Sequence, residues 1–436
     1  MSEKEKPRKP NIGKIDTNSW YSSTPNRLLA TLGALKGEIN CDVCVIGGGF
    51  TGLSAALELS QNKYSVILLE AQEIAGSASG KNGGQLIRGY NHSPGTLASR
   101  YGSAAAKMMC NVTLEGLALV LDRIAKHDIK CDLKFGHVTA AMNDRHVSSL
   151  KEDIDEWAKI GHTDLKYLNR ERIKDFVRSE KYAGGVFDPK GAHFHPLNYA
   201  LGIAQTLQNI GCRIYDETPV LSIKQGATAR IRTSHGIVNA KFVVLGGNVA
   251  FKGTEKLNRR VIPATAHMVA TEPLDKTLVH AILPRNIAVT DARFIMDYYR
   301  LSSDNRLLFG AGDYSYNGVD YPGRAFSLRK KMADTFPGLA GVKIEHCWNG
   351  PLDITHNRMP GFGRLAPNIF YAHGYCGHGV ILSNMAGKLI AEAVGGTAGR
   401  LDVFAKIRHI PFIGGDLVKR PLFVLGMTWY RLRDMM

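Results

Sequence analysis

Cysteine is scarce and irregularly placed in this sequence, which excludes a scaffold built on disulfides. Seven cysteines are scattered over 436 residues, an odd number without the spacing of a disulfide framework. Cys41 and Cys44 lie close together, but in an apolar strand pattern residues three apart face opposite sides, so we expect no metal or redox site there. These features are typical of a reducing compartment and predict a cytoplasmic location.

Long hydrophobic runs are also missing. The N-terminal residues MSEKEKPRKP carry charges with no apolar stretch after them, so we predict no secretory signal. A membrane-spanning helix needs about 20 apolar residues, and the nearest candidate, PLFVLGMTWY at 421–430, is far shorter. At most we expect this tail to rest on a membrane surface, and we do not favour that contact.

Acidic residues are too few to balance the basic ones. Asp and Glu number 39 against 55 Lys and Arg, and the net charge of +16 suits nucleic acid, an anionic membrane surface or the steering of an anionic substrate. The basic residues are dispersed, without a Lys/Arg stripe or an aromatic platform. We interpret the charge as a solvated surface and expect no nucleic-acid partner.

Glycine, in contrast, is abundant, and one cluster of it forms a nucleotide-binding motif. Gly47, Gly49 and Gly52 make a G-x-G-x-x-G between a buried strand at 41–46 and a helix. A second buried strand ends at Glu70, 18 residues after Gly52, where a carboxylate holds ribose hydroxyls. With no arginine beside Glu70 to accept a 2′-phosphate, the motif favours FAD or NAD over NADP.

Two further glycine-rich segments fit a second half of the dinucleotide. The stretch 75–89, AGSASGKNGGQLIRG, offers backbone N–H groups and the Asn82 and Gln85 amides to a polar ligand, although an ordinary flexible loop has the same composition. The stretch 373–394 predicts a strand end, a glycine turn and an apolar helix whose N-terminus stabilises an anionic reduced ring. His378 in this turn is either catalytic or a structural cap.

The order of the remaining patterns predicts interleaved domains. The expected fold is mixed α/β (α+β), with a Rossmann-like FAD-binding domain and an antiparallel-sheet substrate domain. The predicted boundaries are an N-terminal segment at 1–40, FAD-binding segments at 41–95, 190–255 and 345–400, substrate-domain segments at 96–189 and 256–344, and a C-terminal segment at 401–436.

Together, CDVCVIGGGFTGLSAAL with Glu70, ASGKNGGQ and GYCGHGV resemble the D-amino-acid-oxidase-like flavoprotein superfamily, which includes glycine and sarcosine oxidases. Within it the chain most resembles the gamma-glutamylputrescine oxidases. That likeness also takes in HFHPLN at 193–198, DYYRLSSDNRLLFG at 297–310, TFPGLAGVKI and RMPGFGRL at 358–365, and it runs from about Trp20 to the C-terminus. The resemblance implies an FAD cofactor and an oxidisable amine substrate.

The resemblance also implies which residues hold the cofactor. For the ADP half it implies Gly47, Gly49, Gly52, Glu70 and Val220; for the flavin side Ser79, Asn82, Gly83, Gly84 and Gln85; and for the pyrimidine end of the ring Gly377, His378, Gly379 and Val380. Some relatives tether FAD through a cysteine, but Cys347 is displaced by three residues from the matching position, Gly350. We therefore expect FAD to be bound non-covalently. We also expect no metal.

The expected reaction is hydride transfer from the carbon beside a neutral amine to the flavin, followed by hydrolysis of the imine to an aldehyde and ammonia. With O₂ as acceptor, hydrogen peroxide forms; another electron acceptor is the alternative. Arg88 and Arg300 are candidates to bind a glutamyl carboxylate, unless they form structural ion pairs. Only one of Tyr298 and Tyr299 can face the site. The candidate catalytic residues are thus His378, Arg88, Tyr299 and Arg300.

Two other functions stay open at this stage. One is an FAD-dependent dehydrogenase of an amino acid, such as sarcosine or a cyclic imino acid, that passes electrons to a membrane quinone; the basic surface and the apolar tail motivate it. The other is a basic nucleic-acid-binding protein with structural FAD, which a pI of about 9.5 permits.

Overall fold

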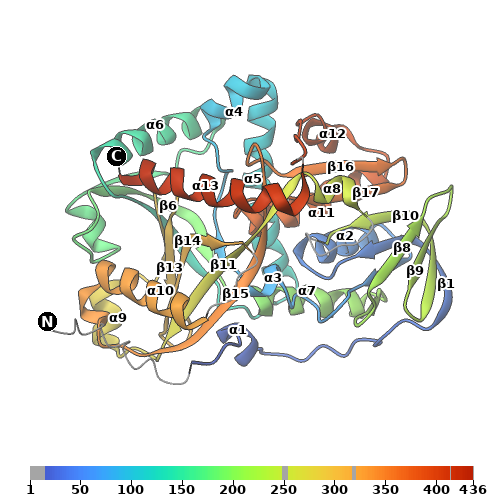
Figure 1. The fold of residues 1–436 in the computed structure, drawn as a ribbon, viewed down its shortest axis with the longest axis horizontal. Helices are drawn as coiled ribbons and strands as arrows, with labels where there is room; N and C mark the ends of the chain where they lie inside the picture. The colour runs from blue at the N-terminus through green and yellow to red at the C-terminus, as the bar shows by residue number, and fades with distance from the viewer. Residues whose placement is uncertain (1–14, 248–253, 317–320, 413, 436) are drawn as a thin grey trace, which may run out of the picture.

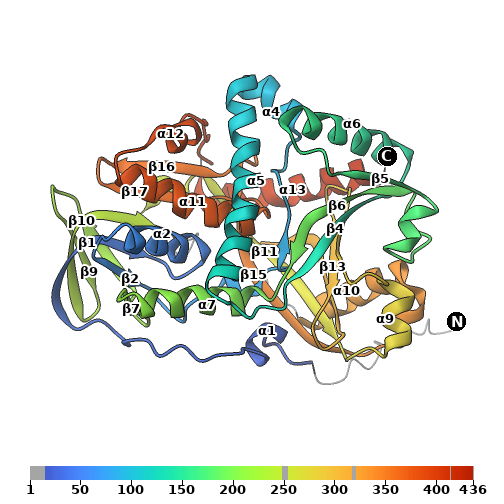
Figure 2. The ribbon, with the colours of Figure 1, turned by 180° about the vertical axis from the view of Figure 1, so that it is seen from behind.

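Two β-sheets drawn from alternating parts of the chain organise the molecule (Figures 1 and 2). The computed structural model describes residues 15–247, 254–316, 321–412 and 414–435. One sheet has eight strands and the other nine, and helices pack around both. This confirms the mixed α/β fold class.

The eight-stranded sheet has a parallel core in the order β17-β10-β1-β2-β7. Strand β16 pairs antiparallel with β17, and β8 and β9 form an antiparallel hairpin on β10. Its central strand β1 buries both faces, because Val43 and Val45 pack into one hydrophobic cluster and Cys44 and Ile46 into another. The strands are β1 (Gly37–Ile46), β2 (Val66–Leu69), β7 (Arg213–Tyr215), β8 (Val220–Lys224), β9 (Ala229–Thr233), β10 (Gly236–Leu245), β16 (Gly361–Ala366) and β17 (Ile369–His373).

The predicted opposite placement of Cys41 and Cys44 is wrong, since both side chains lie in the same apolar cluster. The reason is an irregularity in β1: the N–H groups of Asp42 and Val43 both donate to the Ser65 carbonyl, which shifts the alternation of side chains by one residue. Burial raises the pKa of both thiols, that of Cys41 to about 12. Among the described residues, no cluster of His, Cys, Asp and Glu could hold a metal.

The nine-stranded sheet is mainly antiparallel, in the order β15-β11-β14-β13-β12-β4-β6-β3, with β5 paired to β6. The strands are β3 (Gln85–Leu86), β4 (Lys134–Ala141), β5 (Lys166–Asn169), β6 (Gly184–His193), β11 (Val261–Thr271), β12 (Ala288–Asp291), β13 (Asp297–Leu301), β14 (Leu307–Ser315) and β15 (Ile344–Thr355). Strand β15 falls within the 345–400 segment assigned by sequence to the FAD-binding domain, yet it pairs with β11 of this sheet. The domain boundaries themselves stay a prediction.

Helices α2, α5, α7 and α11 share the largest hydrophobic cluster with one face of the eight-stranded sheet. They pack closely: a Cβ on Gly387 of α11 would lie 2.5 Å from the Ala55 nitrogen of α2. The helices are α1 (Trp20–Ser23), α2 (Phe50–Gln61), α3 (Ala78–Lys81), α4 (Pro94–Tyr101), α5 (Ser103–Lys126), α6 (Asp144–Ile160), α7 (Pro196–Asn209), α8 (Glu255–Asn258), α9 (Lys276–Ile282), α10 (Tyr321–Thr335), α11 (Gly379–Val394), α12 (Gly399–Ala405) and α13 (Gly415–Met435), with 3₁₀ turns at Arg172–Asp175 and Pro337–Leu339.

Within the described part of the chain, α5 alone has the length and apolar composition of a membrane span. It packs against α11 and α4, and side chains including Met109, Val120 and Ile124 are buried. A core helix passes the same test of length and composition, and these contacts are those of a core helix.

Candidate active site

A cavity of about 700 Å³ lies between the two sheets. The glycine turns at the carboxyl ends of the parallel strands line one side of it, which is where open α/β sheets bind ligands. Strands β11, β13, β14 and β15 of the other sheet line the opposite side, and residues of α6 and α13 complete the wall. The site therefore sits where a cofactor on one sheet can meet a substrate on the other.

The G-x-G-x-x-G turn brings the N-terminus of α2 to the cavity. Gly47 adopts a left-handed φ of +106°, and a Cβ on Gly52 would lie 1.8 Å from the Gly47 carbonyl oxygen. Gly49 is the N-cap of α2 and provides no side-chain cap, and Gly49, Phe50 and Thr51 line the cavity. A helix N-terminus that opens to a cavity and whose N-cap residue has no side chain is suited to bind a phosphate.

Glu70 accepts hydrogen bonds from the backbone of this turn and of the loop after β2. Its Oε2 accepts a hydrogen bond of 2.6 Å from the Gly48 N–H and its Oε1 one of 3.0 Å from the Gln72 N–H. Neither Glu70 nor Val220, which is half-buried on the β8–β9 hairpin, lines the cavity. Carboxylate oxygens accept more than one hydrogen bond, so the predicted ribose contact of Glu70 stays compatible with this geometry.

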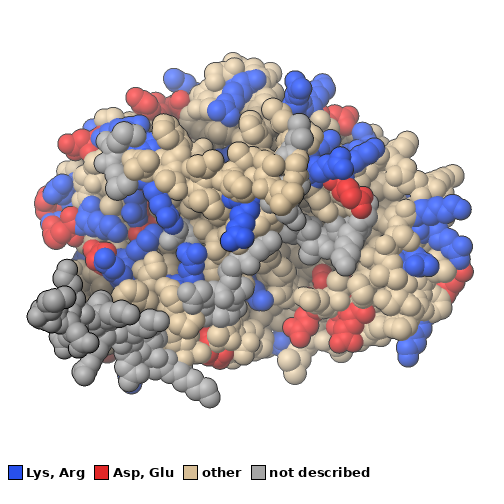
Figure 3. All heavy atoms as spheres, in the orientation of Figure 1, with Lys and Arg blue, Asp and Glu red and all other residues tan. Residues whose placement is uncertain are grey.

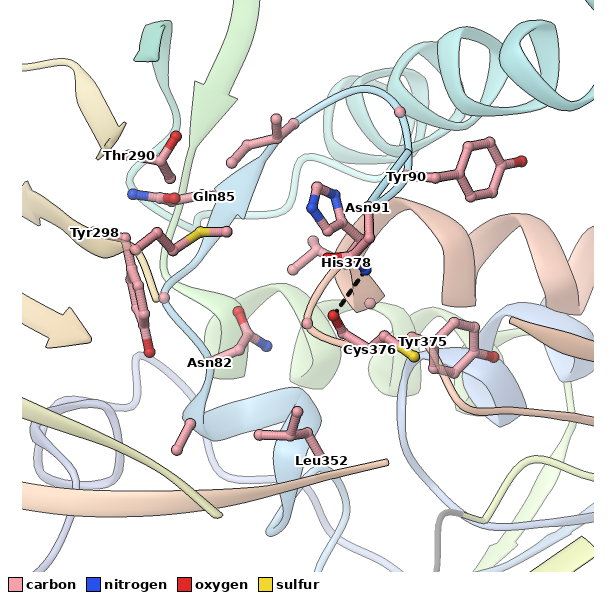
Figure 4. A pocket seen from close by; sticks show the side chains of 18 of the residues that line it. Asn82, Gln85, Tyr90, Asn91, Thr290, Tyr298, Leu352, Tyr375, Cys376 and His378 are labelled. Atoms are coloured by element: carbon pink, nitrogen blue, oxygen red, sulfur yellow. Dashed lines mark hydrogen bonds between the residues drawn. The ribbon is translucent and has the colours of Figure 1, made fainter. Parts of the chain in front are cut away.

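The loop around α3 forms the next part of the wall. Ser79 Oγ accepts from the Phe50 N–H at 2.9 Å, and the Asn82 amide accepts from the Gly84 N–H while donating to the Ser79 carbonyl. Figure 4 shows Asn82 and Gln85 on one side of an open space. Of the predicted flavin-side residues, all but one line the cavity: Ser79, Asn82, Gly83 and Gln85 do, whereas Gly84 does not.

Opposite this loop lies the turn before α11. Gly377, His378, Gly379 and Val380 all line the cavity, as the predicted ring contacts require. Figure 4 shows His378 across the open space from Asn82. Burial, and then the charge of Arg358, lowers the pKa of His378 to about 4. The imidazole is therefore neutral at physiological pH and adds no charge to the site.

Arg88 lines the cavity, but carboxylates already neutralise it. Its guanidinium donates to Asp188 at 2.9 Å and to Asp153 at 3.2 Å, and it lies over the Trp157 ring. Although burial disfavours the charged acid, the neighbouring His162, whose Nε2 lies 3.5 Å from Oδ2, and the charge of Arg88 hold the pKa of Asp188 below its usual range. Arg88 is thus a buried structural ion pair in this structure.

Neither Tyr299 nor Arg300 reaches the cavity, in contrast to the prediction. Tyr299 points into the core, where its hydroxyl bonds that of Tyr182 at 2.7 Å. The Arg300 guanidinium donates to the carbonyls of Gly83, Leu301 and Phe194 and to the Tyr21 hydroxyl. Side chains alternate along β13, so Tyr298 is the tyrosine that faces the cavity (Figure 4).

Sequence reasoning missed Arg358, a cation that lines the cavity and, among the described residues, forms no ion pair. Its guanidinium donates to Asn91 Oδ1 at 2.5 Å, and the Asn91 amide donates to the Cys376 carbonyl at 2.9 Å (Figure 4). Arg358 is thereby tied to the turn that carries His378. It belongs to RMPGFGRL, which the resemblance included, but sequence alone gave no sign that it faces the site.

The C-terminal helix completes the wall, which sequence reasoning also missed. The Phe294 ring stacks on Tyr430 of α13 with centroids 3.3 Å apart, and Arg358 lies 4.0 Å from the centroid of the same ring. The Asp434 carboxylate accepts from the N–H groups of Phe294 and Ile295 at 2.9 and 2.8 Å. The end of α13 therefore fixes the loop that closes the cavity near Arg358.

Cys347 is fully buried on β15 of the nine-stranded sheet and does not line the cavity, whereas Gly350 does. This placement supports the expectation of non-covalent FAD. The residues that line the cavity are of the types that bind FAD. A glycine-rich helix N-terminus suits a pyrophosphate, and a second helix N-terminus, at Gly379, faces the predicted position of the flavin ring.

Comparisons with known proteins agree with this geometry. A family model described as FAD dependent oxidoreductase matches residues 42–393. The gamma-glutamylputrescine oxidoreductase of Escherichia coli (strain K12) is 39% identical over 96% of this chain and 98% of that protein. A probable oxidoreductase OrdL of Haemophilus influenzae is 36% identical over 91% of this chain and 92% of that protein.

Solved structures share the fold. Glycine oxidase from Geobacillus kaustophilus superposes with a TM-score of 0.72 at 22% identity, covering 85% of this chain and 99% of that chain. L-Proline dehydrogenase from P. horikoshii gives a TM-score of 0.70 at 18% identity, covering 85% of this chain and 96% of that chain. The resemblance inferred from the motifs is confirmed by the family model and by the curated relatives.

Proposed function

Because the chain belongs to the FAD dependent oxidoreductase family, we propose that it oxidises the primary amine of gamma-glutamylputrescine, or of a closely related amine. Family membership establishes an FAD-dependent oxidoreductase with a small-molecule substrate and an electron acceptor, and it displaces the nucleic-acid-binding alternative. The proposal also includes the identity of the amine, O₂ as electron acceptor with hydrogen peroxide as product, non-covalent binding of FAD and a cytoplasmic location.

One observation carries the choice of substrate: Arg358 lines the cavity without an ion pair to any described residue, beside the turn of His378. Gamma-glutamylputrescine has a carboxylate at its glutamyl end and a primary amine at the other. A guanidinium in a cavity binds a carboxylate by charge-assisted hydrogen bonds. The similarity to the E. coli gamma-glutamylputrescine oxidoreductase supports the same substrate.

When bound, FAD would supply the acceptor for the hydride from the carbon beside the amine. The side chains of the cavity position the substrate. Arg358 binds its carboxylate, and Tyr298 and Gln85 line the cavity wall opposite His378. The neutral His378 leaves the amine without a neighbouring imidazolium, which favours its unprotonated form. The imine product is then hydrolysed to aldehyde and ammonia.

This arrangement predicts a pH profile set by the substrate. An aliphatic amine has a pKa of about 10, so the second-order rate of flavin reduction should rise roughly tenfold per pH unit between about pH 6 and 8. We expect no break near pH 6.5, because the pKa of His378 is about 4. Stopped-flow reduction of the wild type and of His378→Asn measures this. A break that disappears in His378→Asn would instead make His378 the base.

Anaerobic reduction of the flavin tests the proposed substrate. The holoenzyme is mixed with gamma-glutamylputrescine, putrescine, sarcosine or L-proline, and the oxidised flavin band is followed. We expect rapid bleaching with gamma-glutamylputrescine and slow bleaching with the others. Bleaching with sarcosine or L-proline alone would move the substrate to an amino acid, and bleaching with none would reject the proposal.

A further inference from the structure

Helix α13 attaches to the body by one narrow face. Its inward side chains recur at the spacing of a single helix face: Lys419 donates to the Asn258 carbonyl at 2.9 Å, Phe423 is buried, Tyr430 stacks on Phe294, and Asp434 accepts from two backbone N–H groups. These contacts hold the helix across the front of the molecule (Figure 1). The attachment leaves the opposite face of α13 to solvent.

That opposite face is apolar along its length. Its exposed side chains are Leu417 (89% exposed), Leu425 (67%), Trp429 (60%), Val424 (54%), Leu432 (50%), Leu422 (44%) and Val418 (39%). At about 100° per residue they fall in one arc centred opposite Phe423. A continuous exposed apolar face of this kind marks an interaction surface.

Arginines border this apolar face on both sides. At the same helical spacing Arg420 and Arg431 fall along one edge and Arg433 along the other, and all three are exposed. Figure 3 shows the face that α13 crosses as mainly uncharged, with Lys and Arg beside it. An apolar helix face of this kind can insert among lipid acyl chains, while the arginines along its edges bind the phosphates of the headgroups.

We infer that α13 docks the protein on an anionic lipid surface, with Leu425 and Trp429 inserted and the bordering arginines on the phosphates. The helix lies outside residues 42–393, which the family model covers. Because Arg433 and Asp434 also line the cavity, docking brings the cavity close to the membrane surface.

A second copy of the chain fits this face less well. Two-fold pairing would set the face against itself and bring the same arginines together, in a chain whose net charge is +16. Like charges facing each other oppose such an interface. An anionic bilayer neutralises the arginines, and for this reason it is the occupant that the charges favour.

Vesicle flotation of the FAD-loaded full chain tests the inference. We expect binding to phosphatidylcholine vesicles that contain phosphatidylglycerol, weakened by salt, and little binding to phosphatidylcholine alone. Trp429 provides a second signal, since Trp20, Trp157 and Trp348 are buried and Trp429 alone of the four tryptophans is exposed. Its emission should shift to shorter wavelength on binding.

Leu425→Glu should lower vesicle binding at least tenfold, and Arg420→Gln should lower binding to anionic vesicles severalfold. The matched control is Leu28→Glu, which changes a leucine 90% exposed in the N-terminal segment and should bind as the wild type does. All three variants should keep the flavin spectrum and the rate of flavin reduction. Wild-type protein that does not float, or unchanged binding by Leu425→Glu, would overturn the inference. Dimers dissociated by Leu425→Glu in the absence of lipid would assign the face to a second copy instead.

Discussion

Gly52→Ala is expected to yield a protein without bound flavin. The added Cβ would lie 1.8 Å from the Gly47 carbonyl oxygen and 3.1 Å from a Val45 methyl, and the first of these is backbone that cannot rotate away. To relieve the overlap, the turn that presents the N-terminus of α2 to the cavity must open. The pyrophosphate site is lost with it, because that site consists of backbone N–H groups.

The experiment compares three variants by visible spectrum and by FAD titration of the apoprotein. Gly52→Ala should weaken FAD binding by about a hundredfold or more, or abolish it, as expected for a loss of at least about 3 kcal/mol. Gly49→Ala should weaken it less, since its Cβ would meet the Ser79 Oγ at 2.9 Å and that side chain can rotate. Gly399→Ala is the control, because nothing lies within 4 Å of the Cβ it would add. A normal flavin spectrum in Gly52→Ala would show that the turn does not hold the cofactor.

The sequence was most informative where function depends on the backbone. Gly47, Gly49 and Gly52 were predicted from their spacing, and the structure places them in the turn before α2, at its N-cap and in its first turn. The left-handed φ of Gly47 and the close approach at Gly52 favour glycine at these two positions. The turn at 377–380 was predicted for the same reason and lines the cavity. Patterns of this kind are local, so a short stretch of sequence contains them completely.

Side chains that reach the cavity from distant segments could not be predicted in the same way. The sequence showed that only one of Tyr298 and Tyr299 faces the site, but the choice depends on the register of β13 against β14 and β12, which pairing far along the chain determines. Arg88 was one of two candidates to bind a carboxylate, with a structural ion pair as the alternative, and the structure shows it paired with Asp153 and Asp188, 65 and 100 residues away. The contribution of α13 to the cavity wall depends on tertiary packing, which no local pattern predicts.

Arg358→Met is expected to impair the enzyme selectively toward substrates that carry a carboxylate. The variant keeps the length of the aliphatic chain and removes the guanidinium, which in this structure has Asn91 but no carboxylate among its described partners. A charge-assisted hydrogen bond contributes about 2 kcal/mol, so kcat/KM for gamma-glutamylputrescine should fall roughly thirtyfold, mainly through KM.

N-acetylputrescine provides the matched substrate, because it keeps the amide and the primary amine but lacks the carboxylate. Arg358→Met should oxidise it at the wild-type rate, and Arg145→Met, which removes another cation from the cavity lining, should change neither substrate by more than about threefold. An equal loss with both substrates would mean that Arg358 acts on the turn of His378 through Asn91 and Cys376. The glutamyl carboxylate would then need another partner, and the assignment of gamma-glutamylputrescine would lose the structural observation that carries it.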